Sequence, residues 1–350
     1  MQLRIYSPEL NFLGITENQT SVVWTRKYYE PGTFQIELPV TTENLTLYRI
    51  GNIVSKRDTI EAGVIEDLRI HENASEHTLT VKGRFLSSYM DRRLIRPKYN
   101  FSGYTEVAMR TILTNAVAIP LVELGTLQEF TEEITFQATY KNLLSYETKL
   151  AKGAGMGFRF RPDFTAKKIY FEVYKGLDHS RNQTDRAFVE FSDKFDNMEN
   201  TEAWFCDKLY KNVGYVGGQG EGDARVYVQV GDDTLTGLER REVFIDANDI
   251  SQDEGMSLET YQQKLAERGA QKLNECVFSN SIECDTIPYG NFQYKRDFDL
   301  GDIVTVKKPE WGYTADQRIT EISEVYEHEI AKIVPTLGTA LPETIDMEDK

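Results

Sequence analysis

The sequence predicts an α+β fold dominated by β-structure, with two related small β-barrels, an inserted helix–hairpin α/β subdomain and a further helix–strand element. Three observations predict this fold. Short segments that alternate apolar and polar residues recur towards both ends of the chain. Segments of helical periodicity lie between them. One pattern of turn and strand residues occurs twice.

The composition indicates a folded, acidic protein. Hydrophobic residues make up 40% and aromatic residues 11% of the 350 residues, which is enough for a sizeable core and excludes wholesale disorder. The net charge of −16 argues against a general nucleic-acid binder held by phosphate contacts. The first ten residues lack the apolar segment of a secretory signal, and no apolar run is long enough to cross a bilayer. We therefore expect no membrane anchor. The three cysteines are unpatterned, so we expect a reducing compartment.

Residues 1–100 are predicted to form the first β-barrel. Phe34, Ile36 and Leu38 alternate with polar residues and would face one side of a strand. Two further strands are indicated at 63–70 and 77–81, with a polar turn at 72–75 between them. Short strands at this spacing are typical of a small antiparallel barrel or sandwich.

Residues 101–186 are predicted to form the inserted α+β subdomain. Helical spacing of apolar residues indicates helices at 104–116 and 140–152, and Gly153 is placed to end the second. An antiparallel hairpin is indicated from 158 to 174. Helices beside such a hairpin make a compact unit.

The remaining residues are predicted to complete the second barrel. Strands in 187–249 contribute to it, and 286–337 finish it. Between them, 250–285 form a helix–strand element with a helix over 257–276. Residues 338–350 are polar and are expected to form a flexible tail.

An internal echo supports the two related barrels. Residues 50–56 resemble 300–307, and the strands that follow resemble each other in the same order. The second copy needs a longer connection between its two strands. The aligned structural positions are Gly51 with Gly301, Ile53 with Ile303, and Glu66 with Glu321.

Several short motifs together resemble phage and prophage tail hub proteins. An acidic-Leu-Gly-Asp strand at 297–306 precedes an Arg-Ile-Thr-Glu-Ile strand at 318–326, as in the C-terminal part of that family. Residues 63–67 and 240–247 also resemble it. Each motif is short, so the resemblance depends on their order, which extends from Met1 to about residue 335.

The resemblance implies a structural protein of the tail tip or baseplate, similar to the trimeric baseplate hub of contractile-tailed phages. Such a hub is a virion component made in the host cytoplasm. Its homotrimeric ring would adapt the six-fold tail tube to the three-fold tip around a central channel. The implied partners are a second copy of the chain, a distal tail or tail tube protein, and a spike, fibre or tail-lysin protein. DNA would contact it only in transit, and lumenal acidic residues would repel the passing phosphates.

The residues indicate no catalytic centre, metal site or cofactor. His71 and His328 each begin a zinc-protease pattern, but Ser75 and Lys332 stand where its second histidine must fall. Cys206 lies in an aromatic run and is interpreted as a small buried apolar residue. One alternative is a cell-wall-cleaving tail hydrolase; its pair of catalytic carboxylates cannot be identified by spacing among 56 acidic residues. The other is an intracellular carbohydrate-binding β-protein.

A glycine-rich segment at 214–222 is interpreted as a mobile hairpin loop. It lacks the Gly-Lys-Ser/Thr ending of a phosphate-binding loop, and strands rather than a helix flank it. Such a loop can become ordered on a partner. Gly217, Gly218 and Gly220 are therefore the candidate partner-binding positions.

Overall fold

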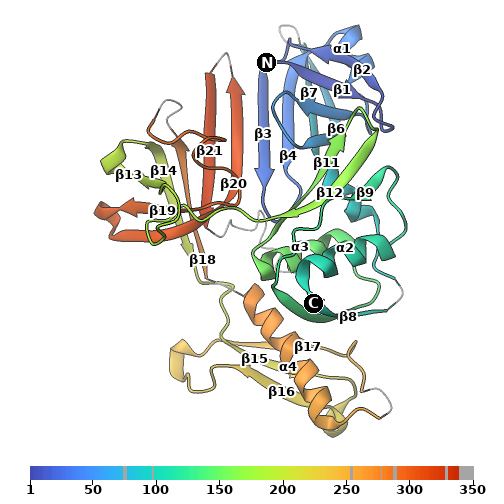
Figure 1. Ribbon diagram of the computed structural model, residues 1–350, viewed down its shortest axis with the longest axis vertical. Helices are drawn as coiled ribbons and strands as arrows, with labels where there is room; N and C mark the ends of the chain where they lie inside the picture. The colour runs from blue at the N-terminus through green and yellow to red at the C-terminus, as the bar shows by residue number, and fades with distance from the viewer. Residues whose placement is uncertain are drawn as a thin grey trace.

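The computed structural model describes residues 1–73, 77–96, 98–252, 255–276, 278–286, 290–327 and 330–338. The predicted tail beyond Gly338, residue His328 and part of the predicted turn at 72–75 lie outside these ranges. The described chain is a β-dominated α+β structure, as the sequence predicts (Figure 1).

One sheet of 13 strands forms the upper part of the molecule (Figure 1). Its order is β14-β18-β21-β20-β3-β4-β7-β6-β5-β1-β2, and β19 pairs with both β20 and β13. The strands from the first hundred residues are β1 (Leu3–Tyr6), β2 (Phe12–Thr16), β3 (Ser21–Lys27), β4 (Thr33–Pro39), β5 (Ile53–Lys56), β6 (Ala62–Glu72) and β7 (His77–Phe85). Those from the second half are β13 (Glu190–Ser192), β14 (Met198–Cys206), β18 (Ser279–Thr286), β19 (Ile303–Lys308), β20 (Tyr313–Glu327) and β21 (Ile330–Gly338).

Two parts of this sheet have the same topology. The first repeat has the spatial order β3-β4-β7-β6-β5, and the second has β14-β18-β21-β20-β19. Within each repeat, the first strand pairs with the second, the third with the fourth, and the fifth with both the fourth and the second. In the described chain, this sheet ends at β2 on one side and at β14 on the other. Its strand pairing closes neither of the two predicted barrels.

Alternation along the strands gives each repeat its own core. In β4, Phe34, Ile36 and Leu38 are buried as predicted, while their neighbours are half-buried, because successive side chains of a strand point to opposite faces. They pack with Trp24 and Phe85 in the first repeat. The second repeat has a separate cluster, which includes Phe191, Phe298, Leu300, Val304, Ile319, Ile322 and Leu337.

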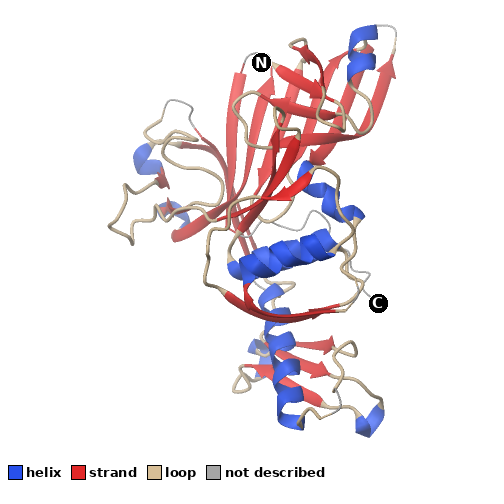
Figure 2. Ribbon diagram, turned by 45° about the vertical axis from the view of Figure 1, so that its right-hand side comes forward, coloured by secondary structure: helices blue, strands red, loops and turns tan. Residues whose placement is uncertain are grey.

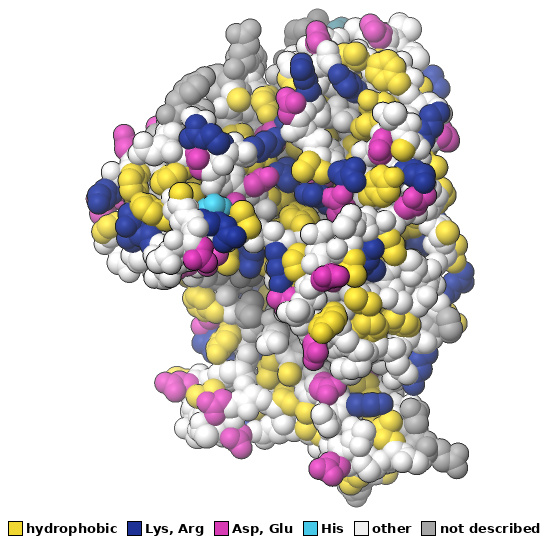
Figure 3. Space-filling view, in the orientation of Figure 1, with side chains coloured by type: hydrophobic (Ala, Val, Ile, Leu, Met, Phe, Trp, Pro, Cys, Tyr) yellow, Lys and Arg dark blue, Asp and Glu magenta, His cyan; other side chains and the backbone are white. Residues whose placement is uncertain are grey.

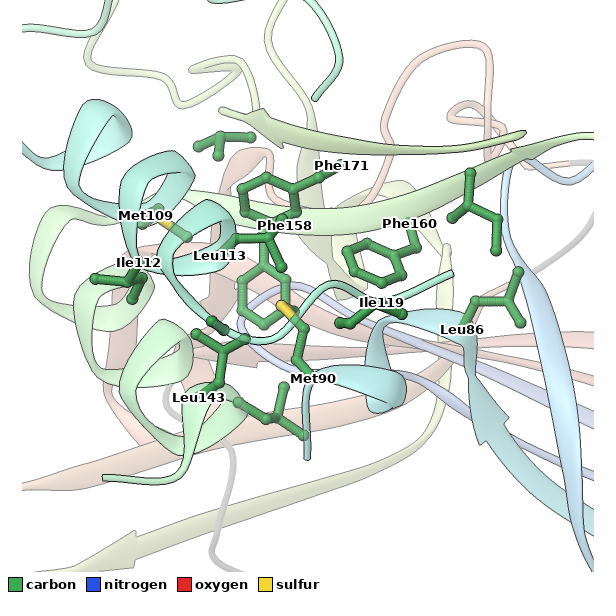
Figure 4. Packing of buried hydrophobic residues seen from close by; sticks show 14 of the residues in the cluster. Leu86, Met90, Met109, Ile112, Leu113, Ile119, Leu143, Phe158, Phe160 and Phe171 are labelled. Carbon is green, nitrogen blue, oxygen red and sulfur yellow. The ribbon is translucent and has the colours of Figure 1, made fainter. Parts of the chain in front are cut away.

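The first insertion contains the predicted helices, which lie below the repeats, and the predicted hairpin, which packs beside the first repeat (Figure 1). The insertion consists of β8 (Tyr99–Tyr104), α2 (Thr105–Asn115), β9 (Val122–Leu124), β10 (Glu133–Ala138), α3 (Leu143–Ala154), β11 (Gly157–Asp163) and β12 (Lys168–Tyr174). Figure 4 shows Met109, Ile112 and Leu143 from the helices facing Phe158 and Phe171 from the hairpin.

Gly155, rather than the predicted Gly153, ends α3. Asn142 caps its start by accepting a hydrogen bond from the Ser145 backbone N–H at 3.0 Å. At the other end, Gly155 has φ 63°, the left-handed conformation that glycine adopts without steric cost. The helix therefore continues through Gly153.

The second insertion differs from the prediction that the strands of 187–249 contribute to the second barrel. Only β13 and β14 join the large sheet, whereas β15 (Val213–Gly217), β16 (Tyr227–Gly231) and β17 (Glu242–Asp246) form a sheet of their own. Helix α4 (Leu258–Glu275) lies along this sheet (Figure 2). Tyr261 and Leu265 of α4 pack with Val216 and Ile245, so the small sheet has an apolar partner outside the repeat.

The two insertions contact each other. The Gln271 side chain on α4 donates a hydrogen bond to the Thr135 carbonyl at 2.7 Å. Arg268 forms an ion pair with Asp249 at 3.1 Å and donates to the Gln137 carbonyl at 3.2 Å. Among the described helices, none is long and apolar enough to cross a membrane.

A carboxyl group is buried in the first insertion. Glu147 on α3 is 0% exposed, and neither of its carboxyl oxygens has a hydrogen-bond partner among the described residues. Burial raises the pKa of Glu147 well above its ordinary 4.5. Burial therefore favours the neutral, protonated form of this group in the folded protein.

Replacing Glu147 with Met is expected to stabilise the protein and to remove a pH dependence. The stability that the raised pKa provides is fully present below pH 4.5 and is lost as the pH rises towards the raised value. The loss amounts to about 1.4 kcal/mol per pH unit in that window. Urea midpoints measured from pH 5 to pH 8 test this. Glu147→Gln is the matched control, because it removes the titration and keeps a buried polar group; an unchanged pH profile in both variants would contradict the assignment.

Candidate assembly site at the seam between the repeats

The predicted turn positions Gly51 and Gly301 have the same backbone geometry. Their φ angles are 90° and 95°, a region that favours glycine. In the first repeat, the Gly51 N–H donates to the Ile65 carbonyl and the Ile65 N–H donates to the Asn52 carbonyl, each at 2.9 Å. The second repeat makes the same two bonds, from Gly301 N–H to the Ile319 carbonyl and from Ile319 N–H to the Asp302 carbonyl, both at 2.8 Å.

The predicted pairing of Glu66 with Glu321 is one residue out of register. The shared hydrogen bonds align Ile65 with Ile319, so Glu66 matches Thr320. Each of these two residues lies at a β-bulge, where the ladder to the next strand shifts register. Because both repeats have this bulge, it does not cause the error. The sequence pattern makes the connection before the strand one residue too long in the second copy, as the two matching sets of hydrogen bonds show.

The residues after the two turns have different surroundings. Ile53 is buried in the cluster that the first repeat shares with the insertion. Ile303 is half-buried, and its backbone N–H donates to the Leu177 carbonyl at 2.9 Å. Glu66 accepts two hydrogen bonds from Arg84, at 2.8 and 3.1 Å. The two repeats are therefore more alike in their backbone hydrogen bonds than in their side-chain contacts.

Replacing each of the two turn glycines with alanine gives a matched pair of variants. A Cβ on Gly51 would have only Pro8 within 4 Å, at 3.9 Å, whereas one on Gly301 would lie 2.3 Å from the Tyr28 ring. Gly51→Ala is expected to cost about 1–2 kcal/mol from its positive φ alone. Gly301→Ala is expected to cost clearly more, because the ring of Tyr28 must also move. Chemical denaturation of both variants measures the difference, and equal losses would show that the close approach to Tyr28 is unimportant.

Strand β20 joins the two repeats. Its first part, up to Arg318, pairs with β19 inside the second repeat. Its later part, Glu321 to Glu327, pairs antiparallel with β3 of the first repeat. Because β20 pairs with β21 along its other edge, this strand belongs to both repeats at once, and the seam between them is a continuous β-ladder (Figure 1).

A buried ion pair crosses the seam beside this ladder. The side chains of Lys56, at the end of β5, and Glu324, on β20, form a salt bridge and are only 4% and 2% exposed. Tyr326 donates to the same carboxylate at 2.6 Å, and Tyr294 and Lys295 donate to it at 3.1 and 3.3 Å. The carboxylate thus has several donors that compensate for its removal from water.

A second buried cation lies near the first pair. Arg26 on β3 donates to Glu61 at 3.2 Å within the first repeat. It also donates to Asp299 at 2.6 Å and to the Tyr294 hydroxyl at 2.9 Å, both in the second repeat. Tyr294 donates in turn to Glu324, so one network connects the charged side chains on both sides of the seam.

The network keeps Glu324 ionised. Burial acts to raise the pKa of Glu324, but the nearby Lys56 and Lys295 and the hydrogen bonds outweigh it and lower the pKa from 4.5 to about 2. This contribution to stability is present above pH 4.5 and is lost as the pH falls towards 2. The seam is therefore expected to be acid-sensitive.

Breaking the ion pair is expected to destabilise the protein by about 3–5 kcal/mol, because one charge is left buried alone. Lys56→Met and Glu324→Gln are the single variants, and Glu324→Gln is also expected to lose stability less steeply between pH 4.5 and 3. The combined variant Lys56→Met/Glu324→Gln is expected to lose less than the sum of its parts. Urea denaturation across this cycle measures the coupling, and additive losses would contradict it.

The structure brings the glycine-rich segment into the second insertion. Gly217 ends β15, and Gly217 and Gly218 are buried, while Gly220 is exposed. Arg225 donates to the carbonyls of Gly217 and Gly218 at 3.0 and 2.8 Å. The Gln219 backbone N–H donates to the hydroxyl of Tyr261 on α4 at 2.7 Å. Backbone and side-chain hydrogen bonds thus hold the start of this hairpin, and Gly220 is on its exposed part.

The structure adds no metal site to this seam. In the described parts of the chain, no group of three or more His, Cys, Asp or Glu side chains is arranged to hold a metal ion. Cys206 is half-buried at the end of β14. Cys284 is buried, and burial raises its pKa to about 12, which disfavours the reactive thiolate.

Sequence reasoning missed the charged residues of the seam. Lys56 and Glu324 are 268 positions apart, and both residue types are common in this chain. The sequence carries a weak signal of the buried charge. Glu324 alternates with Ile322 and Tyr326, so a charged side chain shares one face of the strand with two large side chains. Only the pairing of β20 with β3 shows that this position is buried.

The fold is that of prophage tail proteins. A 43 kDa tail protein of prophage MuSo2 from Shewanella oneidensis superposes with a TM-score of 0.60 at 14% identity, over 97% of this chain and 98% of that chain. A tail protein from Neisseria meningitidis MC58 gives 0.59 at 14% identity, over 96% of both chains. Prophage tail protein gp18 from Listeria monocytogenes gives 0.53 at 12% identity, over 96% and 94%.

A family model identifies the chain more narrowly. The model for the Siphovirus ReqiPepy6 Gp37-like protein matches residues 2–339, so the chain belongs to this family. A search of curated protein sequences finds no significant match.

Proposed function

We propose that the protein is a structural hub of a phage tail tip that assembles as a homotrimeric ring. Three copies would present six related modules, two from each chain, to the six-fold tail tube. The observation that carries the proposal is the shared order of five strands in the two repeats, together with the same glycine turn and the same bulge. Membership of a siphovirus family and the fold of prophage tail proteins support it.

The doubled module addresses a symmetry mismatch. A partner with six-fold symmetry offers six equal contacts, whereas a trimer of single-module subunits offers three. Two similar modules per chain make six nearly equal contacts with three subunits. The seam between β3 and β20 then fixes the spacing of the two modules within each chain.

The two insertions are proposed to form the opposite end of the hub. The second insertion and the helices of the first lie together below the repeats, so the repeats would meet a distal tail or tail tube protein and the insertions a spike, fibre or tail-lysin protein (Figure 2). The hairpin with Gly217, Gly218 and Gly220 belongs to this end and remains a proposed partner contact. On the face in Figure 3, acidic side chains stand out over the lower unit, which is compatible with a channel that repels DNA phosphates.

The proposed role is structural and involves no catalysis, with the virion as its location. A zymogram of the purified protein distinguishes this role from the alternative, a cell-wall hydrolase. The hub is expected to leave peptidoglycan intact in a zymogram, and clearing that disappears when one acidic pair is changed would favour the enzyme.

Mass photometry of the purified chain tests the hub. The expected species has three times the 40.2 kDa mass of the chain, alone or with its distal tail or tube partner. Electron microscopy of this species is expected to show a ring with six similar densities and a central channel. A monomer under all these conditions, or a closed dimer, would contradict the proposal.

A further inference from the structure

The seam inside each chain has a counterpart that is open in a single copy. If the repeats are equivalent, the counterpart of β3 is β14, and the counterpart of the later part of β20 is the later part of β6. We propose that β14 of one copy pairs antiparallel with residues 67–72 of β6 in a second copy. This inference rests on the proposed trimeric hub and identifies the strands through which its copies meet.

Both proposed edges are without a strand partner in the described chain. Strand β14 pairs only with β18 and ends the path of the large sheet. Strand β6 pairs with β5 only through residues 62–64, so the same edge is open from residue 67 onwards. In the second repeat, the matching edge of β20 is occupied by β3. Open strand edges are sites where another chain adds by backbone hydrogen bonds.

The ladders give the equivalent residues directly. In the first repeat, a row of directly opposed residues crosses four strands, and a matching row crosses the second repeat. The first row is Trp24, Phe34, Gly83 and Ile65, and the second is Ala203, Ile282, Leu337 and Ile319. Trp24 therefore matches Ala203, and Asp67, two residues after Ile65, matches Glu321.

The register of the internal seam then predicts the register between copies. Within the chain, Glu321 lies opposite Lys27, and Glu324 lies opposite Trp24. Transferring this register to the open edges places five pairs across the contact. They are Asp67 opposite Cys206, Leu68 opposite Phe205, Arg69 opposite Trp204, Ile70 opposite Ala203, and His71 opposite Glu202.

The exposure of these residues fits a covered surface. Ile70 is 56% exposed and Phe205 is 52% exposed, yet their equivalents Glu324 and Arg26 are only 1% and 4% exposed in the internal seam. Where the internal seam uses a buried ionic network, the proposed one has apolar side chains on the same face. Burying large apolar residues of this kind is favourable in water.

The other face of the contact carries complementary groups. Trp204 is 48% exposed, and the transferred register places it opposite Arg69, whose guanidinium suits an aromatic face. His71 falls opposite Glu202, and this pair brings no electrostatic repulsion. No pair in the transferred register brings two like charges together.

The position of the two edges favours a ring. Strand β14 lies at one side of the molecule and β6 at the other (Figure 1). A contact between two different surfaces is head-to-tail, and such contacts close into rings when the rotation is right. With two modules per chain, three copies give six modules joined alternately by internal and external seams.

A disulfide between copies tests the register. Asp67→Cys introduces a thiol opposite the native Cys206 of the next copy, and opposed residues of antiparallel strands lie about 4.5–5.5 Å apart, within disulfide reach. Mild oxidation of the purified full chain is expected to give covalent dimers and trimers on a non-reducing gel, reversed by reductant. Asp67→Cys/Cys206→Ser and Asp233→Cys, which places a thiol on an exposed loop of the second insertion, are controls expected to give neither.

A second variant tests the surface without a new bond. Ile70→Arg puts a charge on a position that is exposed in the single chain, so its folding is expected to be unaffected, with an unchanged melting temperature. Its trimer is expected to dissociate at protein concentrations at least ten times higher than the unmodified trimer. Ile60→Arg, an exposed apolar position outside the contact, is the matched control and is expected to behave like the unmodified protein.

The outcomes separate this inference from the hub itself. A trimer by mass photometry with no Asp67→Cys crosslink, or an Ile70→Arg trimer as stable as the original, would overturn the strand contact and leave the hub standing. A chain that neither trimerises nor crosslinks, alone or with its partner, would overturn both. Crosslinked trimers that disappear with Cys206→Ser would support both.

Discussion

The pairing of one long strand with two repeats is the constraint on which the rest of the structure depends. Strand β20 completes the second repeat with its first part and binds β3 of the first repeat with its later part. This arrangement buries the carboxylate of Glu324, which must be compensated by Lys56 from the other repeat. The backbone ladder and the ion pair therefore hold the two repeats in one relative position.

The two repeats keep a common framework while carrying different additions. Both retain the same strand order, glycine turn and bulge. Where a short turn through Gly32 joins β3 to β4, the second repeat has the whole unit of β15 to β17 and α4 between β14 and β18. Additions at such a turn leave the ladders intact, because the two strands can pair whatever connects their ends. A ring-forming framework can therefore acquire different contacts at its outer end.

Local features of the fold were predicted well, and longer-range features were not. The helices at 104–116 and 257–276 match α2 and α4 within about a residue, because apolar spacing and caps are local properties. The placement of β15 to β17 in a separate sheet was missed, because a strand pattern does not reveal its partner. The one-residue error at Glu66 has a similar origin, since strand pairing and not the residue pattern sets the length of the connection before that strand.

The sequence by itself determined the main helices and the hairpin of the insertions, the doubled turn at Gly51 and Gly301, and the resemblance to tail hubs, because each depends on residues that are neighbours in the chain. Only the tertiary structure decided that β3 pairs with β20, that Lys56 meets Glu324, and that β14 and the later part of β6 are left open. These are contacts between distant segments. Their energy comes from burial and backbone pairing, which many segments of similar composition satisfy equally well until the whole sheet is assembled.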